Sequence, residues 1–311
     1  MKDKLITLIG GGGFLGRYVA QEALAAGARV RIVERDPRRA WFLKPLGGLG
    51  QTQFVAADVT KPQTIMRAVE GSDAVVYLVG TWGPDFRGIQ VDGPGAAAAA
   101  ARATGARSFV LVSTIGADPA SASAYYRSKG EGEAAARAAW PGATILRPSI
   151  VFGPEDKFIN RFAGMVAGPV VPVLRAGARF QPVYVADVAR AAAAVLGDPV
   201  SFGGRTFELA GPEVLTMGEL VRWLAQATGR SPAIVELPDM VGAALSMVGF
   251  LPGAPISRDQ WRMLQTDNVA SGKVDGFAAL GITPMAMAGV APSWLVRYRR
   301  NGRFGTPAAS A

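Results

Sequence analysis

Apolar residues along the first half of the chain follow two alternating patterns. Short and almost continuous apolar runs, each ended by glycine or a polar residue, predict buried β-strands. Longer segments between them repeat apolar residues at helical spacing, which predicts amphipathic helices. The predicted strands are 5–9, 29–33, 52–58, 73–79, 108–114 and 143–149, and the predicted helices are 14–27, 61–71, 95–106 and 124–140.

The regular alternation of strand and helix predicts the fold class. Crossover helices between parallel strands are right-handed, and parallel sheets are covered by helices on both faces. We therefore expect an α/β fold, a Rossmann-type doubly wound parallel sheet.

The pattern loses this regularity after Val151, where proline and glycine become frequent. Helical spacing returns at 185–197 and 216–229, separated by short extended pieces. This favours a smaller C-terminal α/β domain that is partly interleaved with the first. The predicted Rossmann domain comprises residues 1–152 and 179–200, the smaller domain comprises residues 153–178 and 201–304, and residues 305–311 are predicted to be a disordered tail.

Three glycines follow the first predicted strand in the segment LIGGGGFLGRYV. Gly10, Gly13 and Gly16 lie between that strand and the first helix, where the lack of side chains lets backbone N–H groups approach a pyrophosphate. The N-terminus of the helix also favours an anion. A plain tight turn is the alternative, but the βαβ units that follow favour a dinucleotide site. Further residues expected to line the cofactor are Phe14, Leu15, Val59, Val79, Gly80 and Pro148.

The residues after the second strand bear on the choice of dinucleotide. Glu34 lies where a carboxylate accepts the ribose 2′-OH of NAD. Arg35 and Arg39 follow, and a guanidinium here suits the 2′-phosphate of NADP. Glu34 can turn away and pair with an arginine, so the segment favours NADP(H), with NAD(H) as the alternative. Asp58, after the third strand, is placed either to contact adenine or to cap a turn.

The amino-acid composition restricts the chemistry. The 311 residues include no histidine and no cysteine, so acid–base work falls to Tyr, Lys, Asp or Glu. The net charge of +9 favours anionic partners. No block of Lys and Arg resembles a nucleic-acid arm, and we expect no nucleic-acid partner. No apolar stretch approaches the ~20 residues of a spanning helix, which favours a soluble or peripheral protein.

The segment SAYYRSKGEG contains a tyrosine and, four residues later, a lysine. Tyr125 and Lys129 share one face of the predicted helix, and an ammonium there would lower the pKa of the phenol from about 10. Ser113 and Thr114, at the end of the fifth strand, are placed to hold a substrate oxygen. Tyr125 and Lys129 are either a proton-transfer pair or part of a helix surface, and the glycine loop earlier in the chain favours the pair.

These segments together resemble the short-chain dehydrogenase/reductase superfamily, in its extended or atypical branch. The resemblance runs through GGGGFLG, DAVVYLVG, SFVLVST, YYRSK and LRPSIVFGP and covers most of the chain. It implies a phosphate loop at the three glycines. It also implies a catalytic triad of Ser113 or Thr114 with Tyr125 and Lys129, in which Lys129 also contacts the nicotinamide ribose.

A narrower resemblance links ILRPSIVFGPEDKFINRFA, QPVYVADVARA and TFELAGPEVLTMGELV to the NADPH-binding accessory subunit of respiratory complex I and its bacterial relatives. This family implies a bound NADPH, complex I subunits as partners and a structural role near the quinone site. It implies a cytoplasmic location, or a peripheral one on the inner face of a bacterial inner membrane. The alternative is an active NAD(P)H-dependent oxidoreductase or epimerase. Asp92 and the short loop before Tyr125 depart from the usual sequence pattern of that superfamily.

Three segments of the second half are candidates for contact with a partner. Residues 155–166 are predicted to form an amphipathic helix whose polar face, with Asp156, Lys157, Asn160 and Arg161, meets either a substrate or partner or only water. Residues 239–255 are apolar, and they either dock on a membrane or partner or pack on the smaller domain. The segment SWLVRYRRNGRF combines aromatic residues with arginines, which is typical of an anionic membrane surface or of a frayed basic tail.

Overall fold

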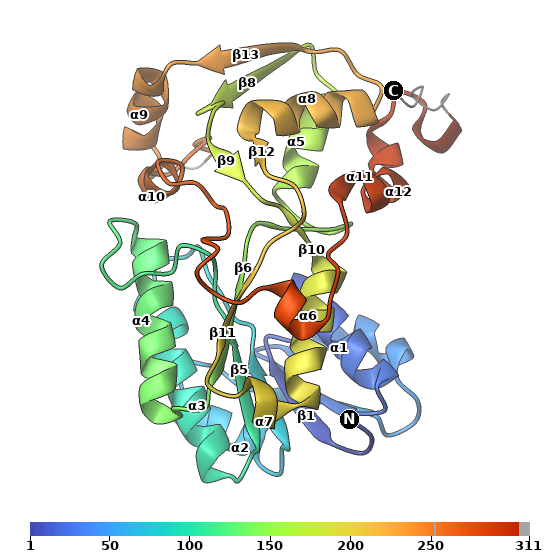
Figure 1. Ribbon diagram of the computed structural model, residues 1–311, viewed down its shortest axis with the longest axis vertical. Coiled ribbons are helices and arrows are strands. Elements are labelled where there is room, and N and C mark those ends of the chain that lie inside the picture. Colours follow the sequence, from blue (N-terminus) through green and yellow to red (C-terminus); the bar gives the residue numbers. More distant parts are fainter. Residues whose placement is uncertain (252, 305–311) are drawn as a thin grey trace. The chain divides into compact units, whose positions relative to one another are not determined.

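The computed structural model describes residues 1–251 and 253–304 (Figure 1). The tail predicted at 305–311 lies outside the described residues. The chain divides into two compact units. Unit 1 consists of Met1–Pro148, Val185–Leu209 and Ser271–Thr283, and unit 2 consists of Ser149–Tyr184, Ala210–Ala270 and the residues from Pro284 onward.

A parallel sheet of seven strands forms the centre of unit 1, in the order β11-β6-β5-β4-β1-β2-β3. The strand order reverses between β1 and β4, which is the topological switch point where doubly wound sheets bind ligands. The architecture confirms the predicted Rossmann-type doubly wound parallel sheet. The strands are β1 (Leu5–Ile9), β2 (Arg29–Glu34), β3 (Thr52–Ala56), β4 (Ala74–Tyr77), β5 (Ser108–Val112), β6 (Thr144–Pro148) and β11 (Thr206–Leu209).

Helices cover both faces of this sheet, which explains why β4 and β5 are buried along their whole length (Figure 1). On one face α2 (Pro62–Val69), α3 (Gly93–Ala103) and α4 (Ala124–Ala139) pack in series. On the other face α1 (Phe14–Ala25) packs against α6 (Val185–Gly197), although the two are far apart in sequence. The shorter elements are η1 (Pro37–Leu46), a π-helical turn η2 (Gly88–Asp92), α7 (Pro199–Phe202) and η3 (Phe277–Leu280).

The boundaries of unit 1 differ from the predicted domain boundaries at the sheet edge. Strand β11 lies in the range 201–304 that the sequence pattern places in the smaller domain, yet it pairs in parallel with β6, Phe207 opposite Leu146. The Glu208 N–H in turn donates to the carbonyl oxygen of Asp275 at 2.8 Å. These backbone hydrogen bonds place β11 and the segment around Asp275 in unit 1.

Unit 2 combines short strand pairs with helices around its own apolar core, to which Phe152, Leu220 and Trp294 contribute. Its strands pair as β7 with β10, β8 with β13 and β9 with β12. Its elements are β7 (Val151–Phe152), α5 (Ile159–Met165), β8 (Val170–Leu174), β9 (Arg179–Phe180), β10 (Val183–Tyr184), β12 (Leu215–Thr216), α8 (Met217–Ala227), β13 (Ala233–Leu237), α9 (Asp239–Met247), α10 (Arg258–Met263), α11 (Met287–Val290), α12 (Pro292–Leu295), η4 (Val296–Tyr298) and η5 (Gly302–Phe304).

Two of the four polar residues predicted on the surface of helix 155–166 are internal to unit 2, whereas Lys157 and Arg161 are exposed. Asp156 is buried and accepts the backbone N–H groups of Gly153 at 3.2 Å and Ile159 at 2.6 Å. Asn160 is buried too, and its Oδ1 accepts from Arg297 at 2.7 Å. Asp156 and Asn160 therefore belong to a structural network at the start of α5, which engages the first arginine of the predicted basic tail.

The contact between α4 and η2 leaves no room for a side chain at Gly132, where a Cβ would lie 1.9 Å from the carbonyl oxygen of Gln90. Gly132→Ala should therefore lower the free energy of unfolding by roughly 1–3 kcal/mol, the usual effect of overpacking. Gly197→Ala at the end of α6 is the matched control, because a Cβ there meets no atom within 4 Å. Alanine is the better helix former, so the control should be neutral or stabilising by up to about 1 kcal/mol. Denaturant unfolding measures both, and equal effects would contradict the close contact.

Candidate functional site

The glycine loop joins β1 to α1 beside the switch point of the sheet. Gly10 adopts a positive φ of +84°, and a Cβ there would lie 2.9 Å from Cγ2 of Val79, just after β4. Gly16 lies in the first turn of α1, where a Cβ would approach the carbonyl oxygen of Gly11 to 2.6 Å. The loop therefore packs closely on both β4 and α1, and it presents the N-terminus of α1 at the edge of the sheet.

The start of α1 has the features of an anion site. Gly13 is the N-cap and offers no side-chain hydrogen bond, and the N–H of Arg17 donates to the Gly13 carbonyl oxygen at 3.2 Å. The N–H groups of Phe14 and Leu15 lie in the first turn, before this hydrogen bond of the helix. A Cβ on Gly13 would meet only the carbonyl oxygen of Gly10, at 3.3 Å, so the space in front of the helix is open. Loop and helix terminus together fit a pyrophosphate.

Glu34, at the end of β2, is bound to the glycine loop. Its Oε1 accepts the N–H of Gly12 at 2.7 Å, and burial raises the pKa of this carboxyl, against the opposing effects of that hydrogen bond and of Arg35. The Glu34 carboxylate is thus engaged by the backbone N–H of Gly12, whereas the sequence analysis allowed it to turn toward an arginine. Arg35 is exposed, and Arg38 is held by Asp36 at 2.9 Å.

Asp58 caps the turn that follows β3. Its Oδ1 accepts the backbone N–H of Thr60 at 3.0 Å and donation from the Thr60 hydroxyl at 2.8 Å. These hydrogen bonds hold the pKa of Asp58 below its usual range, and Arg35 contributes in the same direction. The turn-capping role, one of the two predicted for Asp58, is therefore present. Val59 beside it packs against the apolar core.

Helix α4 carries the tyrosine and the lysine of the predicted pair. Ser123 caps the helix, its Oγ accepting the N–H of Tyr126 at 3.3 Å. Lys129 is buried, and its Nζ lies 5.9 Å from the ring centroid of Tyr125. A Cβ on Gly80 would lie 3.6 Å from the same Nζ, so α4 brings Lys129 to the residues that follow β4. Burial lowers the pKa of Lys129 to about 8, although Glu133 opposes this shift.

The pKa of Tyr125 is shifted in the direction opposite to the prediction. Burial raises the pKa of the phenol above its usual value, and the neighbouring Tyr126 adds to the shift. The expectation that Lys129 would lower it was wrong because desolvation of a phenolate outweighs the field of an ammonium that is itself desolvated. The phenol of Tyr125 is therefore neutral at physiological pH and remains a proton donor.

Aromatic side chains that the sequence analysis missed surround Tyr125. The ring of Trp82 stacks on that of Tyr125 with centroids 4.2 Å apart and planes 8° from parallel. Phe86 contacts the same ring edge-on at 6.2 Å. Both come from the segment GTWGPDF after β4. The sequence did contain a signal for this contact: two aromatic residues in a loop rich in glycine and proline, where aromatic side chains are seldom needed for a core.

The remaining predicted residues lie at the ends of β5 and β6. Ser113 is buried, and among the described residues its Oγ has no hydrogen-bond partner. Thr114 Oγ1 donates to the carbonyl oxygen of Ile115 at 3.2 Å, and Ile115 N–H donates to Pro148 at 3.0 Å. Sequence reasoning also missed Gln90, which accepts the N–H of Thr81 at 3.3 Å and donates to Ser128 at 2.8 Å. Gln90 therefore ties α4 to the loop that carries Trp82.

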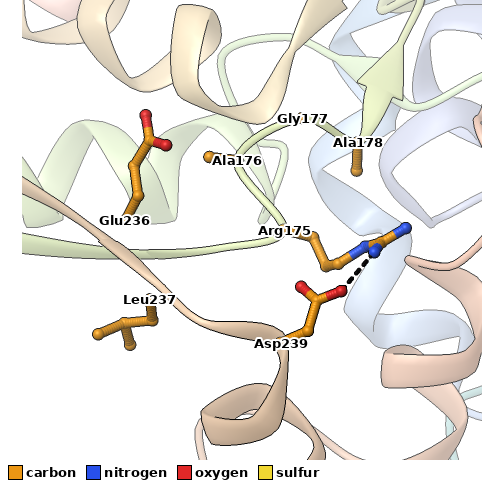
Figure 2. Close-up of a pocket in the computed structure, with 7 residues that line it drawn as sticks. All are labelled: Arg175, Ala176, Gly177, Ala178, Glu236, Leu237 and Asp239. Carbon is orange, nitrogen blue, oxygen red and sulfur yellow. Dashed lines mark hydrogen bonds and ion pairs between the residues drawn. The ribbon is translucent and has the colours of Figure 1, made fainter.

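A cavity of about 350 Å³ in unit 2 is unrelated to these residues (Figure 2). Its charged groups already have partners: Arg175 binds Asp239 at 2.6 Å, and Glu236 binds Arg222 at 2.7 Å. The lining residues are Arg175, Ala176, Gly177, Ala178, Glu236, Leu237 and Asp239. With its charges neutralised by one another, this cavity offers no unmatched group to a cofactor.

Residues 1–251 and 253–304 contain no helix that is both long and apolar enough to cross a bilayer. The same ranges contain no group of three or more acidic side chains placed to hold a metal ion.

The model of a family described as NAD(P)H-binding matches residues 10–199, which include the glycine loop and α4. The chain belongs to this NAD(P)H-binding family. It is 34% identical over 287 residues to NADH dehydrogenase (ubiquinone) 1 alpha subcomplex subunit 9 from the mitochondria of Mus musculus, covering 89% of this chain and 76% of that protein. The predicted resemblance to the accessory subunit of complex I is thereby confirmed.

Two further proteins show the range of the similarity. The Ceramide reductase of Caulobacter vibrioides is 34% identical over 241 residues, covering 76% of this chain and 74% of that protein. The crystal structure of an NADPH-dependent quinone oxidoreductase from Escherichia coli, complexed with NADPH, superposes with a TM-score of 0.75 at 20% identity, covering 93% of this chain and 99% of that one. The similarity to the quinone oxidoreductase is one of fold.

Gly13→Val should abolish nucleotide binding, because the valine would fill the open space in front of α1. The backbone of Gly13 is extended (φ −73°, ψ −178°), which valine adopts without strain, so the variant should still fold. Calorimetric titration with NADPH and with NADH measures the loss. Gly197→Val, at an open helix end, controls for the general effect of the substitution. Undiminished affinity in a folded Gly13→Val protein would refute this placement of the pyrophosphate.

Proposed function

We propose that this protein is an NAD(P)H-loaded structural or assembly component of respiratory complex I, NADH:ubiquinone oxidoreductase. The similarity to the NADH dehydrogenase alpha subcomplex subunit, over most of both chains, supports this role. The protein would act from the inner face of a bacterial inner membrane, near the quinone site, as the family resemblance implies.

The observation that carries a binding role is the environment of Tyr125. Its ring lies under Trp82, and burial raises the pKa of its phenol. A general acid works best when its pKa is near the operating pH, and this phenol has moved away from it. The glycine loop and α1, by contrast, offer open space and donors to a pyrophosphate. This arrangement favours retention of the nucleotide over its turnover.

We infer that the glycine loop and the start of α1 hold the pyrophosphate, and that Val79, Gly80, Lys129 and Pro148 line the nicotinamide half. When bound, the dihydronicotinamide supplies a hydride. If a substrate were reduced there, the neutral phenol of Tyr125 would be the proton donor, and Ser113 and Thr114 would offer hydroxyls to the substrate oxygen. Lys129, with its pKa near 8, carries an ammonium at neutral pH to bind the ribose.

The association of the tagged chain with complex I tests the proposed role. Affinity purification from solubilised membranes of the native host should recover complex I subunits, identified by mass spectrometry. Tyr125→Phe should leave this association and the nucleotide content nearly unchanged, because the phenol makes no contribution to a scaffold. Gly13→Val should reduce both. Loss of association in a Tyr125→Phe protein that retains its nucleotide would contradict the scaffold role.

A second candidate function is an active NAD(P)H-dependent oxidoreductase, the alternative that the Tyr125–Lys129 pair left open. The similarity to Ceramide reductase favours it, as does the buried Oγ of Ser113, which has no hydrogen-bond partner among residues 1–251 and 253–304. In that case Tyr125→Phe should slow carbonyl-dependent oxidation of NADPH by roughly 10²-fold or more, the usual contribution of a positioned acid. Complex I association would then be absent for the wild type as well, so the two functions give opposite results.

We further propose that NADP(H) is preferred over NAD(H). Glu34 is bound to Gly12, while the exposed Arg35 lies close enough to affect the pKa values of Glu34 and Asp58. Arg35→Ala should therefore weaken NADPH roughly tenfold or more, the scale of one charge-assisted contact to a phosphate, and NADH far less. Arg38→Ala is the matched control, because Asp36 holds that guanidinium. Equal losses for both nucleotides by calorimetry would show that Arg35 does not read the 2′-phosphate.

A further inference from the structure

Residues 37–49, which follow β2, expose apolar side chains to solvent although other side chains of the segment are buried. The 3₁₀ helix η1 starts at Pro37, and Asp36 caps it by accepting the N–H of Arg38 at 3.2 Å. Ala40 and Leu43 are fully buried and attach η1 to unit 1. These two buried side chains anchor η1 and so fix the position of the exposed side chains beside them.

The outward side of this segment is unusually apolar. Trp41 is 49% exposed and Phe42 is 47% exposed; nearby in sequence, Leu46 is 43% exposed and Leu49 is fully exposed. Single exposed apolar residues are normal, but two large aromatics and two leucines within nine residues form a patch. Clusters of exposed apolar residues are typical of interaction sites.

Cations surround these apolar side chains. Lys44 Nζ lies 4.1 Å from the ring centroid of Trp41, and the guanidinium carbon of Arg17 lies 4.7 Å from that of Phe42. Residues 35–49 carry four cationic side chains and one carboxylate, Asp36, which binds Arg38. We call this patch, formed by Trp41, Phe42, Leu46 and Leu49 with Arg39 and Lys44, the η1 surface.

We propose that the η1 surface docks on an anionic phospholipid bilayer. Tryptophan and phenylalanine prefer the depth of the lipid headgroups, leucines can enter the acyl boundary, and lysine or arginine beside them binds lipid phosphates. The Lys44 ammonium over the Trp41 ring keeps its charge at the depth where phosphates lie. The proposal adds a lipid-binding surface to the membrane location proposed above, and its test uses lipid alone, so it does not depend on association with complex I.

The other candidate surfaces lack this combination of apolar and charged groups. The exposed apolar residues in and after α9, such as Met240, Met247 and Phe250, have no charged residue among 240–257 to match anionic lipid. In the C-terminal segment Arg297 donates to Asn160 and to the carbonyl oxygen of Pro154, at 2.7 and 2.8 Å, inside unit 2. The η1 surface is thus favoured by charge complementarity.

Vesicle flotation of the full-length, nucleotide-loaded protein tests the proposal. The protein should float with vesicles of phosphatidylcholine that also contain phosphatidylglycerol, and hardly with phosphatidylcholine alone. Raising the salt concentration should weaken binding, because the attraction to lipid phosphates is screened. Absence of flotation with anionic vesicles at low salt would overturn the proposal, as would equal binding to both kinds of vesicle.

Substitutions then locate the docking surface. Lys44→Glu changes the charge by two, so it should lower the vesicle-binding constant on the order of tenfold or more. Leu49→Ser and Trp41→Ser should lower it as well, through the lost apolar contact. The matched controls are Arg67→Glu on α2 and Val200→Ser on α7, both exposed and outside the η1 surface, and they should bind like the wild type.

Nucleotide affinity and thermal unfolding show that each variant is folded, and Leu49→Ser keeps the test valid if Trp41→Ser fails to fold, because Leu49 packs against little. If Lys44→Glu and Leu49→Ser float like the wild type, the η1 surface is not the docking site. If these variants lose association with complex I in detergent while the wild type never binds vesicles, the surface serves a protein partner and the lipid proposal is wrong.

Discussion

The close fit of helix α4 is the constraint on which the candidate site depends. Two glycines let the helix approach its neighbours: a Cβ on Gly130 would lie 2.5 Å from the backbone of Asp118, and one on Gly132 would lie 1.9 Å from Gln90 O. Glu133 on the same helix forms a two-pronged ion pair with Arg147 of β6, at 2.9 and 2.6 Å. Together these contacts fix the depth and rotation of α4, and with them the position of every side chain it carries.

The same close fit decides the electrostatics of that position. A helix so near its neighbours excludes water from Lys129, and a charge that loses water is destabilised. Lys129 responds with a pKa of about 8, and the tyrosine remains protonated. A bound anionic nucleotide would restore part of the stabilisation that the Lys129 ammonium loses with its water. The site is therefore better suited to holding a ligand with its charges than to cycling a proton through the phenol.

Much of this arrangement could be predicted from the sequence, because it follows from local patterns. Apolar runs ended by glycine gave β1 and its neighbours, and the glycine spacing gave the loop before α1. Strand β11 was missed because TFEL is four residues long and its pairing with β6 is not local. The stacking of Trp82 on Tyr125 and the engagement of Glu34 by Gly12 are likewise contacts between distant segments. The sign of the Tyr125 pKa shift required the degree of burial, which no spacing contains.

The segmented construction of unit 1 has a consequence for its biosynthesis. The chain leaves the sheet after β6, builds part of unit 2, and returns for α6 and β11 and again for the segment around Asp275. During translation, at roughly 5–20 residues per second, β6 is an unprotected sheet edge until Thr206–Leu209 leave the ribosome. A nascent chain halted near Pro148 would expose that edge to other nascent chains. Co-translational chaperones and the speed of decoding between the two segments should therefore decide how much of this protein reaches its folded form.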